Sequence, residues 1–308
     1  MNKPNGTTVR VAAFYRFVDL PDYRALRDKL LAACRQQELL GTILLAHEGI
    51  NGSVAGSDAG IRALFDWFDR DPRLANLEAR TAHAREMPFY RMKVRLKKEI
   101  VSLGVPEVDP AGMAGEYVTP EEWNALISRQ GVRVVDTRND YEVHLGTFRN
   151  AENPDTRSFR EFPEWADQNL DPQSDREIAM FCTGGIRCEK ATAYLRQRGF
   201  SKVYHLQGGI LNYLEKVAPE DSLWQGDCFV FDNRVTVDHQ LRQGDLEVCP
   251  ACRMPVTGED RASPKFELHV SCPRCFDRLT PAKRAGLLER ARQIELAEQR
   301  GYRHLGSR

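Results

Sequence analysis

The stretch FCTGGIRCEK, residues 181–190, places Cys182 directly after an apolar run and ahead of two glycines, an arginine and a helix start. Gly184 and Gly185 allow backbone angles that other residues resist, so consecutive amides can turn inward and form an anion nest. The amides expected to form it are those of Thr183, Gly184, Gly185 and Ile186. The helix start and the permanent charge of Arg187 add to the positive field. The stretch predicts a Cys182 thiolate with a pKa below the ordinary ~8.5 and a catalytic role. A small buried hydrophobe would need neither the glycine pair nor the arginine.

The surrounding block, about residues 117–217, alternates strands with helices. GVRVVDTR (131–138), EIAMFC (177–182) and KVYHLQGGI (202–210) have the composition of buried strands. Thr119 and Pro120 form a helix start. This order predicts an α/β domain with a parallel sheet and ligands at the carboxyl ends of its strands, where Cys182 lies.

The block before it, about residues 8–105, has the order β-α-β-β-α-β, which predicts a ferredoxin-like α+β domain. Asn51-Gly52 is interpreted as the turn between its second and third strands. The last strand is expected at about 89–101. A Gly- and Pro-rich stretch at about 104–116 is interpreted as a linker.

The expected last strand, RMKVRLKK (91–98), alternates strictly between cations and apolar residues. Its cationic face carries Arg91, Lys93, Arg95 and Lys97. Such a face fits either simple solvation or a phosphate backbone, and on the residues alone both remain open.

The third block, residues 218–308, carries the spacing C-x2-C-x19-C-x2-C through Cys249, Cys252, Cys272 and Cys275. Each Cys-Pro-x-Cys turn can offer two thiolates to one tetrahedral metal, so the spacing predicts a structural zinc site. Disulfides and a redox pair are the alternatives. A charged terminal helix with a basic tail follows.

Composition restricts the location and the partners. Lys plus Arg and Asp plus Glu number 44 each, so an RNA site must be a local patch. The start lacks a signal-peptide pattern, and no run approaches the ~20 apolar residues of a membrane span. We therefore expect a soluble, intracellular protein whose cysteines are thiols or metal ligands. Neither a flavin or haem motif nor a non-haem iron triad is evident.

The middle block resembles a rhodanese domain. The resemblance rests on the C-x4-R loop from Cys182 to Arg187, on Asp136-Thr137-Arg138 and on Gly208-Gly209-Ile210. It implies that the loop cysteine can carry sulfur as a persulfide. The related phosphatases need arginine at position 188, which is Cys188 here, so phosphatase activity is disfavoured. Cys188 either resolves an oxidised Cys182 or is packed away. We interpret Asp136 and Arg138 as structural, and His144 and His205 as packed or surface histidines.

A wider resemblance covers about residues 8–275. AHEGINGSVAG, FYRMKVRLKKEIV, FCTGGIRCEKATAYL and WQGDCFVFDNRV occur in the order found in the bacterial rhodanese-like tRNA uridine hydroxylases. The resemblance implies oxygen-dependent hydroxylation at C5 of the wobble uridine in the tRNA anticodon stem-loop, in the cytoplasm, with Cys182 required. It favours the phosphate interpretation of the basic strand and adds Lys190 and Arg196 as expected tRNA contacts. A sulfurtransferase and a non-catalytic binding module remain alternatives, and the oligomeric state stays open.

Overall fold

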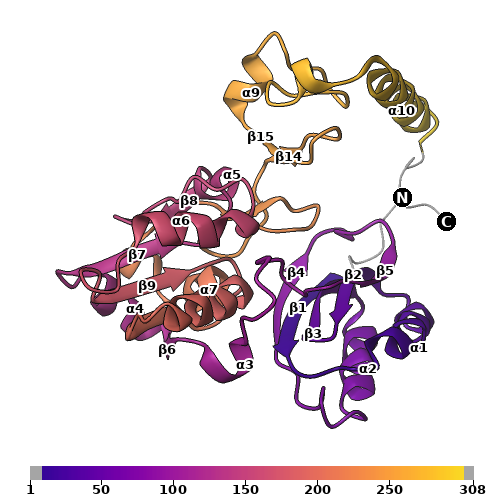
Figure 1. Cartoon of the computed structure of the whole chain (residues 1–308). Coiled ribbons are helices and arrows are strands. Elements are labelled where there is room, and N and C mark those ends of the chain that lie inside the picture. The colour runs from indigo at the N-terminus through magenta and orange to yellow at the C-terminus, as the bar shows by residue number, and fades with distance from the viewer. Residues whose placement is uncertain (1–8, 302–308) are drawn as a thin grey trace.

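The computed structural model describes residues 9–301, except for the side chain of Glu298, and shows an N-terminal, a middle and a C-terminal region (Figure 1). The expected first residue of the N-terminal domain, Thr8, and the basic tail at 302–308 lie outside the described residues.

The N-terminal region forms one five-stranded sheet of order β4-β1-β3-β2-β5. Its elements are β1 (Val9–Phe17), α1 (Tyr23–Gln36), β2 (Leu40–Ala46), β3 (Gly49–Gly56), α2 (Asp58–Phe68), β4 (Ala79–Ala84) and β5 (Met92–Leu96). The first four strands pair antiparallel in the ferredoxin-like order, which confirms the predicted fold class. The expectation that the basic strand closes this motif is wrong. The closing strand is β4, whereas β5 pairs parallel with β2 at the opposite edge.

The two faces of this sheet have different neighbours. Phe14 and Val54 point toward α1 and α2 and belong to one apolar core with Leu30 and Leu64. The interpretation of Asn51-Gly52 as a turn is wrong, because both residues lie inside β3 and residues 47 and 48 make the turn. A Cβ atom on Gly52 would lie 2.8 Å from the Phe14 ring, so close packing accounts for this glycine.

The middle region contains a four-stranded parallel sheet of order β6-β10-β9-β7. Its elements are α3 (Pro110–Met113), β6 (Glu116–Val118), α4 (Pro120–Ile127), β7 (Val132–Asp136), α5 (Asp140–Val143), β8 (Gly146–Phe148), η1 (Phe159–Glu161), α6 (Phe162–Asn169), β9 (Glu177–Phe181), α7 (Ile186–Gln197), β10 (Lys202–Leu206) and α8 (Gly209–Lys216). Alternate residues of β9 enter different cores. Ile178 and Met180 pack with residues of α6 and α7, and Ala179 and Phe181 pack with residues of α4 and α8. The predicted parallel α/β sheet is therefore confirmed.

The stretch interpreted as a linker packs against α7 instead of crossing open solvent. Gln197 donates from Nε2 to the Glu107 carbonyl at 3.1 Å, and the Gly115 amide donates to Thr192 Oγ1 at 2.8 Å. Val108 is buried, and this burial is the physical reason why the stretch is ordered.

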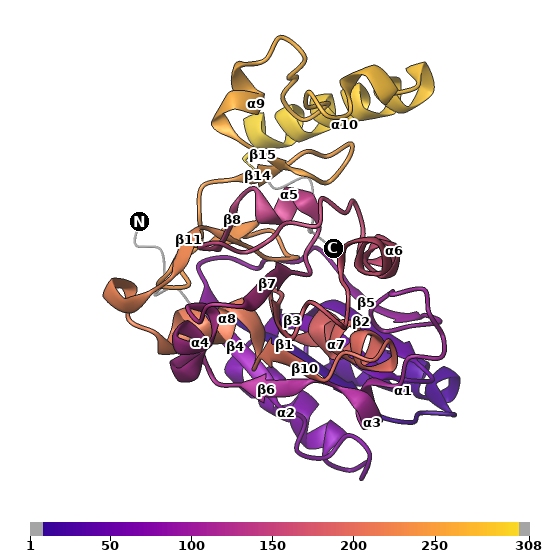
Figure 2. The same cartoon turned by 60° about the vertical axis from the view of Figure 1, so that its left-hand side comes forward.

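The C-terminal region begins by pairing with the middle region, through β11 and β8, and then rises away as a separate module (Figures 1 and 2). Its elements are η2 (Pro219–Asp221), β11 (Trp224–Gly226), β12 (Cys228–Phe229), β13 (Thr236–Val237), β14 (Glu247–Val248), β15 (Pro255–Val256), α9 (Gly258–Ala262), η3 (Phe276–Arg278) and α10 (Pro281–Gln299). Across residues 9–301, none of the helices combines the length and apolarity needed to cross a bilayer.

Candidate active site

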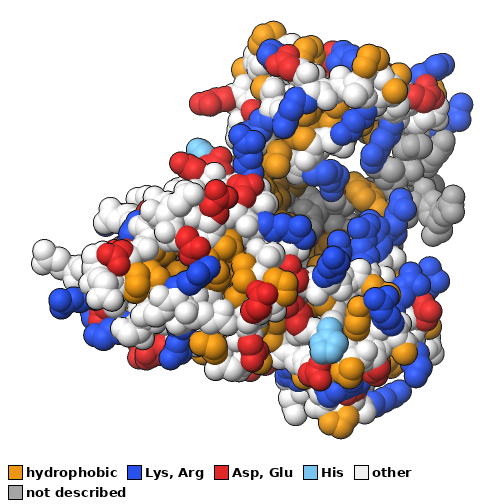
Figure 3. Space-filling model, in the orientation of Figure 1, with side chains coloured by type: hydrophobic (Ala, Val, Ile, Leu, Met, Phe, Trp, Pro, Cys, Tyr) orange, Lys and Arg blue, Asp and Glu red, His pale blue; other side chains and the backbone are white. Residues whose placement is uncertain are grey.

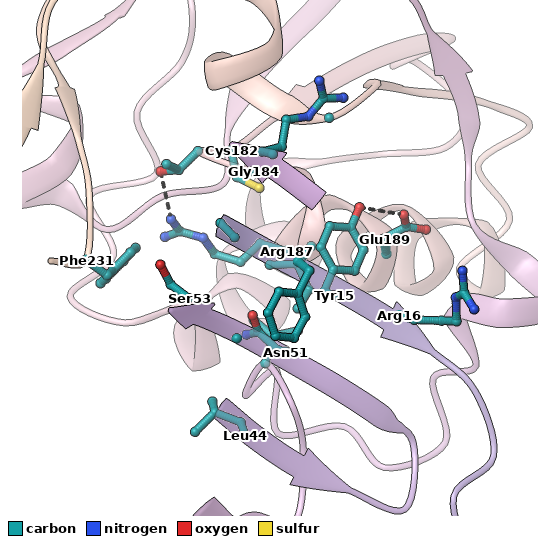
Figure 4. A pocket seen from close by; sticks show the side chains of 18 of the residues that line it. Tyr15, Arg16, Leu44, Asn51, Ser53, Cys182, Gly184, Arg187, Glu189 and Phe231 are labelled. Atoms are coloured by element: carbon teal, nitrogen blue, oxygen red, sulfur yellow. Dashed lines mark hydrogen bonds between the residues drawn. The ribbon is translucent and has the colours of Figure 1, made fainter. Parts of the chain in front are cut away.

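A cleft of about 1310 Å³ lies between the open face of the N-terminal sheet and the carboxyl end of the middle sheet. Tyr15 and Ser53 line it from the N-terminal sheet, Cys182 and Arg187 from the loop after β9, and Phe231 from the C-terminal region (Figure 4). The volume exceeds the ~300–1,000 Å³ of ordinary small-molecule pockets. The cleft therefore has room for part of a polymer.

The loop after β9 is held by backbone hydrogen bonds from the start of α8. The amides of Ile210 and Leu211 donate to the carbonyls of Cys182 and Thr183 at 2.9 and 3.1 Å. A Cβ atom on Gly209 would lie 2.5 Å from the Cys182 carbonyl oxygen, so this close approach requires glycine.

The Cys182 sulfur lies within a ring of hydrogen-bond donors. The Gly185 amide donates to Sγ at 3.1 Å, and Gly185 adopts a φ of +96° at the start of α7. Burial alone would raise the pKa of the Cys182 thiol. The Cys188 thiol, the charge of Arg187 and the amides of residues 187 and 188 outweigh burial and lower that pKa below its usual range. Burial, followed by the charge on Cys182, raises the pKa of Cys188, which therefore stays a thiol. The expected shift of the Cys182 pKa agrees with this geometry.

Not every predicted loop amide has the same part. Gly185 contacts the sulfur, whereas Gly184 has no atom within 4 Å of the place where a Cβ would stand. Thr183 offers its carbonyl to α8 and its hydroxyl to Arg187. Ile186 is the first residue of α7 and lines the cleft.

Arg187 is buried and makes two hydrogen bonds of 2.7 Å to the carboxylate of Glu142 in α5. This pairing fixes the guanidinium beside the loop. Sequence reasoning missed Glu142, although it stands three residues after Asn139, where the two residues make a capping box. A capping-box pattern reveals a helix start but not a partner 45 residues away.

Asp136 and Arg138 form a buried ion pair, with Arg138 Nη2 at 2.6 Å from Asp136 Oδ2. Arg138 also stacks on Trp224. The structural interpretation of this pair therefore holds. His144 is exposed at 3.0 Å from Asp140, and His205 is buried against Tyr117, as expected for a surface and a packed histidine.

A buried carboxylate beside the loop joins the N-terminal and middle regions. Glu189 of α7 accepts hydrogen bonds from Tyr15 at 3.0 Å and from Tyr117 at 2.7 Å (Figure 4). Burial raises the pKa of Glu189 above its usual value, and the two tyrosine hydrogen bonds oppose that rise. The negative charge on Cys182 adds to the rise. Sequence reasoning missed this group because its members come from three distant segments.

The predicted cations of the basic strand lie near the C-terminal module. Arg91, Arg95 and Lys97 are exposed, and Lys93 is half-buried. Burial lowers the pKa of Lys93, and the charges of Arg95, Arg91 and Arg253 lower it further. Arg253 follows Cys252 directly, so cations from two distant segments converge. Figure 3 shows Lys and Arg side chains around the hollow between the module and the N-terminal region.

The two predicted contacts on α7 have different environments. Arg196 is exposed and donates from Nη1 to the Ala114 carbonyl at 2.8 Å. The expectation that Lys190 contacts phosphate is wrong, because Lys190 is 1% exposed. Its Nζ lies 2.8 Å from Glu48 and 2.7 Å from Glu99, so its charge is already paired.

The four C-terminal cysteines come together as the spacing predicts. Their sulfur atoms all lie within 4.8 Å of one another, and Cys249–Cys275 and Cys252–Cys272 are 3.7 and 3.6 Å apart. A disulfide would place sulfurs ~2.05 Å apart, whereas tetrahedral ligands 2.3 Å from zinc stand about 3.8 Å apart. The cluster therefore has the geometry of a metal site and could hold an ion such as zinc.

Two protein-family profiles match the chain: the UPF0176 acylphosphatase like domain over residues 9–100 and the Rhodanese-like domain over residues 119–216. Together with the cysteine loop, they place the chain in the rhodanese superfamily. It is 54% identical over 298 residues to the tRNA uridine(34) hydroxylase of Teredinibacter turnerae, covering 97% of this chain and 93% of that protein. The chain belongs to the tRNA uridine(34) hydroxylase family.

Solved structures match the middle region only. The Rhodanese-like domain of an Anabaena protein is 17% identical, with a TM-score of 0.30, over 36% of this chain and 78% of that one. A rhodanese-related protein from Thermoplasma volcanium is 23% identical, with a TM-score of 0.29, over 34% of this chain and 95% of that one. Scores of this size support no conclusion.

Proposed function

We propose that this chain hydroxylates C5 of the wobble uridine of tRNA in the cytoplasm, using molecular oxygen, with Cys182 as its nucleophile. One observation carries the proposal. A thiol with a lowered pKa lies at the floor of a cleft wide enough for an RNA loop, in a chain that is 54% identical to a tRNA uridine(34) hydroxylase.

The chemistry starts from the poor reactivity of C5 of uracil toward oxygen. The Cys182 thiolate, or a persulfide on it, adds to C6 and forms a sulfur–carbon bond. C5 then gains enolate character and reacts with oxygen, while an electron donor supplies the remaining electrons. The amides around the sulfur and Arg187 stabilise the anionic charge that develops during this addition.

The RNA is held at some distance from the sulfur. The wobble base lies in a single-stranded loop, which a protein can splay open while it holds the stem through phosphates. Arg91, Lys93, Arg95 and Lys97 supply those contacts, together with Arg196. Arg253, whose charge acts on Lys93, supports the same surface from the C-terminal module.

The C-terminal module is stabilised by one zinc ion held by Cys249, Cys252, Cys272 and Cys275. Their sulfur separations fit a tetrahedral thiolate site. The ion supplies folding energy to a small module with few apolar residues. The proposed chemistry at Cys182 does not pass through it.

Mass spectrometry of tRNA nucleosides tests the function directly. Unmodified tRNA is incubated with the protein in air and, in a parallel reaction, under nitrogen. The proposal expects a uridine product with one added oxygen in air only. A product carrying added sulfur would instead identify a sulfurtransferase, and no modified uridine in either atmosphere would refute the activity.

A further inference from the structure

Phe231 is the most exposed large apolar side chain in the part of the chain that the structure describes, at 64%. It lines the cleft and stands near Arg187 (Figure 4). An exposed aromatic ring costs hydrophobic free energy, so its position beside a reactive thiol calls for a ligand.

The ring is supported but not covered. Phe229 meets it edge to face, with ring centroids 5.1 Å apart, and the Arg187 guanidinium lies 5.7 Å from its centroid. Phe229 is in turn held by Tyr141 at 5.3 Å. Since these contacts fix the ring and leave most of it open to solvent, Phe231 forms a flat platform at the edge of the cleft.

Its depth in the cleft decides what the platform holds. Cys182 has no exposed surface, so a uracil whose C6 meets the sulfur must reach the floor. Phe231 is exposed at the rim, which is the wrong depth for that base and the right depth for the next one along the strand. Unpaired RNA bases are held by stacking on aromatic rings.

We propose that Phe231 stacks on an unpaired nucleobase directly next to the target uridine and so fixes the RNA loop while the target base enters the cleft. This inference rests on the proposed function, because it takes the substrate to be an RNA loop. It adds a substrate-positioning residue that the cysteine loop does not contain.

The test measures binding of a fluorescein-labelled anticodon stem-loop RNA by anisotropy. Phe231→Ala should bind roughly 5- to 150-fold more weakly, the range of one lost base–aromatic stack. Phe231→Leu should bind weakly as well, because it keeps apolar bulk without a π face. Phe231→Trp should bind with near wild-type affinity, and Leu288→Ala, another exposed apolar change on α10, should have no effect.

A second RNA series identifies the stacked base. An abasic nucleotide is placed on the 5′ side or on the 3′ side of the target uridine. For one of the two positions, the abasic change should weaken the wild-type protein but have little further effect in Phe231→Ala.

Three results would overturn the inference: wild-type affinity in Phe231→Ala, equal affinity of the Leu and Trp variants, or additive losses at both flanking positions. Nucleoside mass spectrometry of the wild-type reaction reports on the proposed function separately. A wild-type protein that binds and hydroxylates the RNA while Phe231→Ala does the same removes only the stacking role. A wild-type protein that binds no stem-loop removes both.

Discussion

Replacing Lys190 by methionine should destabilise the folded protein strongly, because this lysine joins the N-terminal and middle regions. Lys190 belongs to α7, whereas Glu48 lies between β2 and β3 and Glu99 follows β5. Methionine fills a similar volume but carries no charge. The variant therefore leaves two carboxylates, with side chains only 25% and 16% exposed, facing each other without a cation.

The expected loss follows from the burial of this group. Removing one partner from a buried ion pair costs about 3–5 kcal/mol. Glu48 keeps the Ile100 amide at 2.6 Å and Glu99 keeps the Leu103 amide at 3.0 Å, so both carboxylates stay partly satisfied. We therefore expect a loss at the lower end of that range, roughly 3 kcal/mol.

Urea denaturation at pH 7 measures the change, with Lys202→Met as the matched control. Lys202 also pairs with a glutamate, Glu177, at 2.8 Å, but its side chain is 58% exposed. An exposed pair contributes only about 0–1 kcal/mol. Equal shifts of the urea midpoint in the two variants would refute the inference that Lys190 holds the regions together.

The pH dependence follows from Glu99. Burial raises the pKa of Glu99, but Lys190 and the Leu103 and Gly104 amides outweigh burial and lower it. A lowered folded pKa means that this stabilisation is present above the unfolded glutamate value of ~4.3 and is lost as the pH falls through the folded value. The difference between wild type and Lys190→Met should therefore shrink in acid.

Three further changes test the loop, the metal and the RNA surface. Gly209→Ala would place a Cβ atom within 2.7 Å of backbone atoms of residues 182, 183 and 185, so hydroxylation should fall about 100-fold, whereas Gly286→Ala, with no atom within 4 Å, should keep full activity. Cys272→Ser should lose one zinc ion by native mass spectrometry and lower the melting temperature; an unchanged mass deficit or no bound metal in the wild type would contradict the zinc site. Changing Arg91, Lys93 and Arg95 to Glu should weaken stem-loop binding and flatten its salt dependence by roughly 0.7–0.9 per lost phosphate contact, while the same change at Arg24, Lys29 and Arg35 on α1 should leave the salt slope intact.

The cysteine loop and the zinc-type cluster were predictable because their chemistry is local. Cys182, its glycines and Arg187 lie within six consecutive residues, and each Cys-x-x-Cys turn brings two thiolates together by itself. Strand alternation likewise predicted the parallel sheet.

Contacts between distant segments account for what sequence reasoning missed. β4 reads ARTAHA, which lacks the apolar alternation of a strand, and is recognisable only through its pairing with β1. Lys190 looked like a surface cation because nothing near it in sequence reveals Glu48 and Glu99. Glu142 and Tyr15 meet the loop only through the tertiary fold.

The most direct test of the central claim compares wild type with Cys182→Ala on tRNA under oxygen labelled with ¹⁸O. The account predicts that wild type forms 5-hydroxyuridine containing the label, and that Cys182→Ala binds tRNA normally but forms none. Labelled 5-hydroxyuridine from Cys182→Ala at the wild-type rate would contradict it.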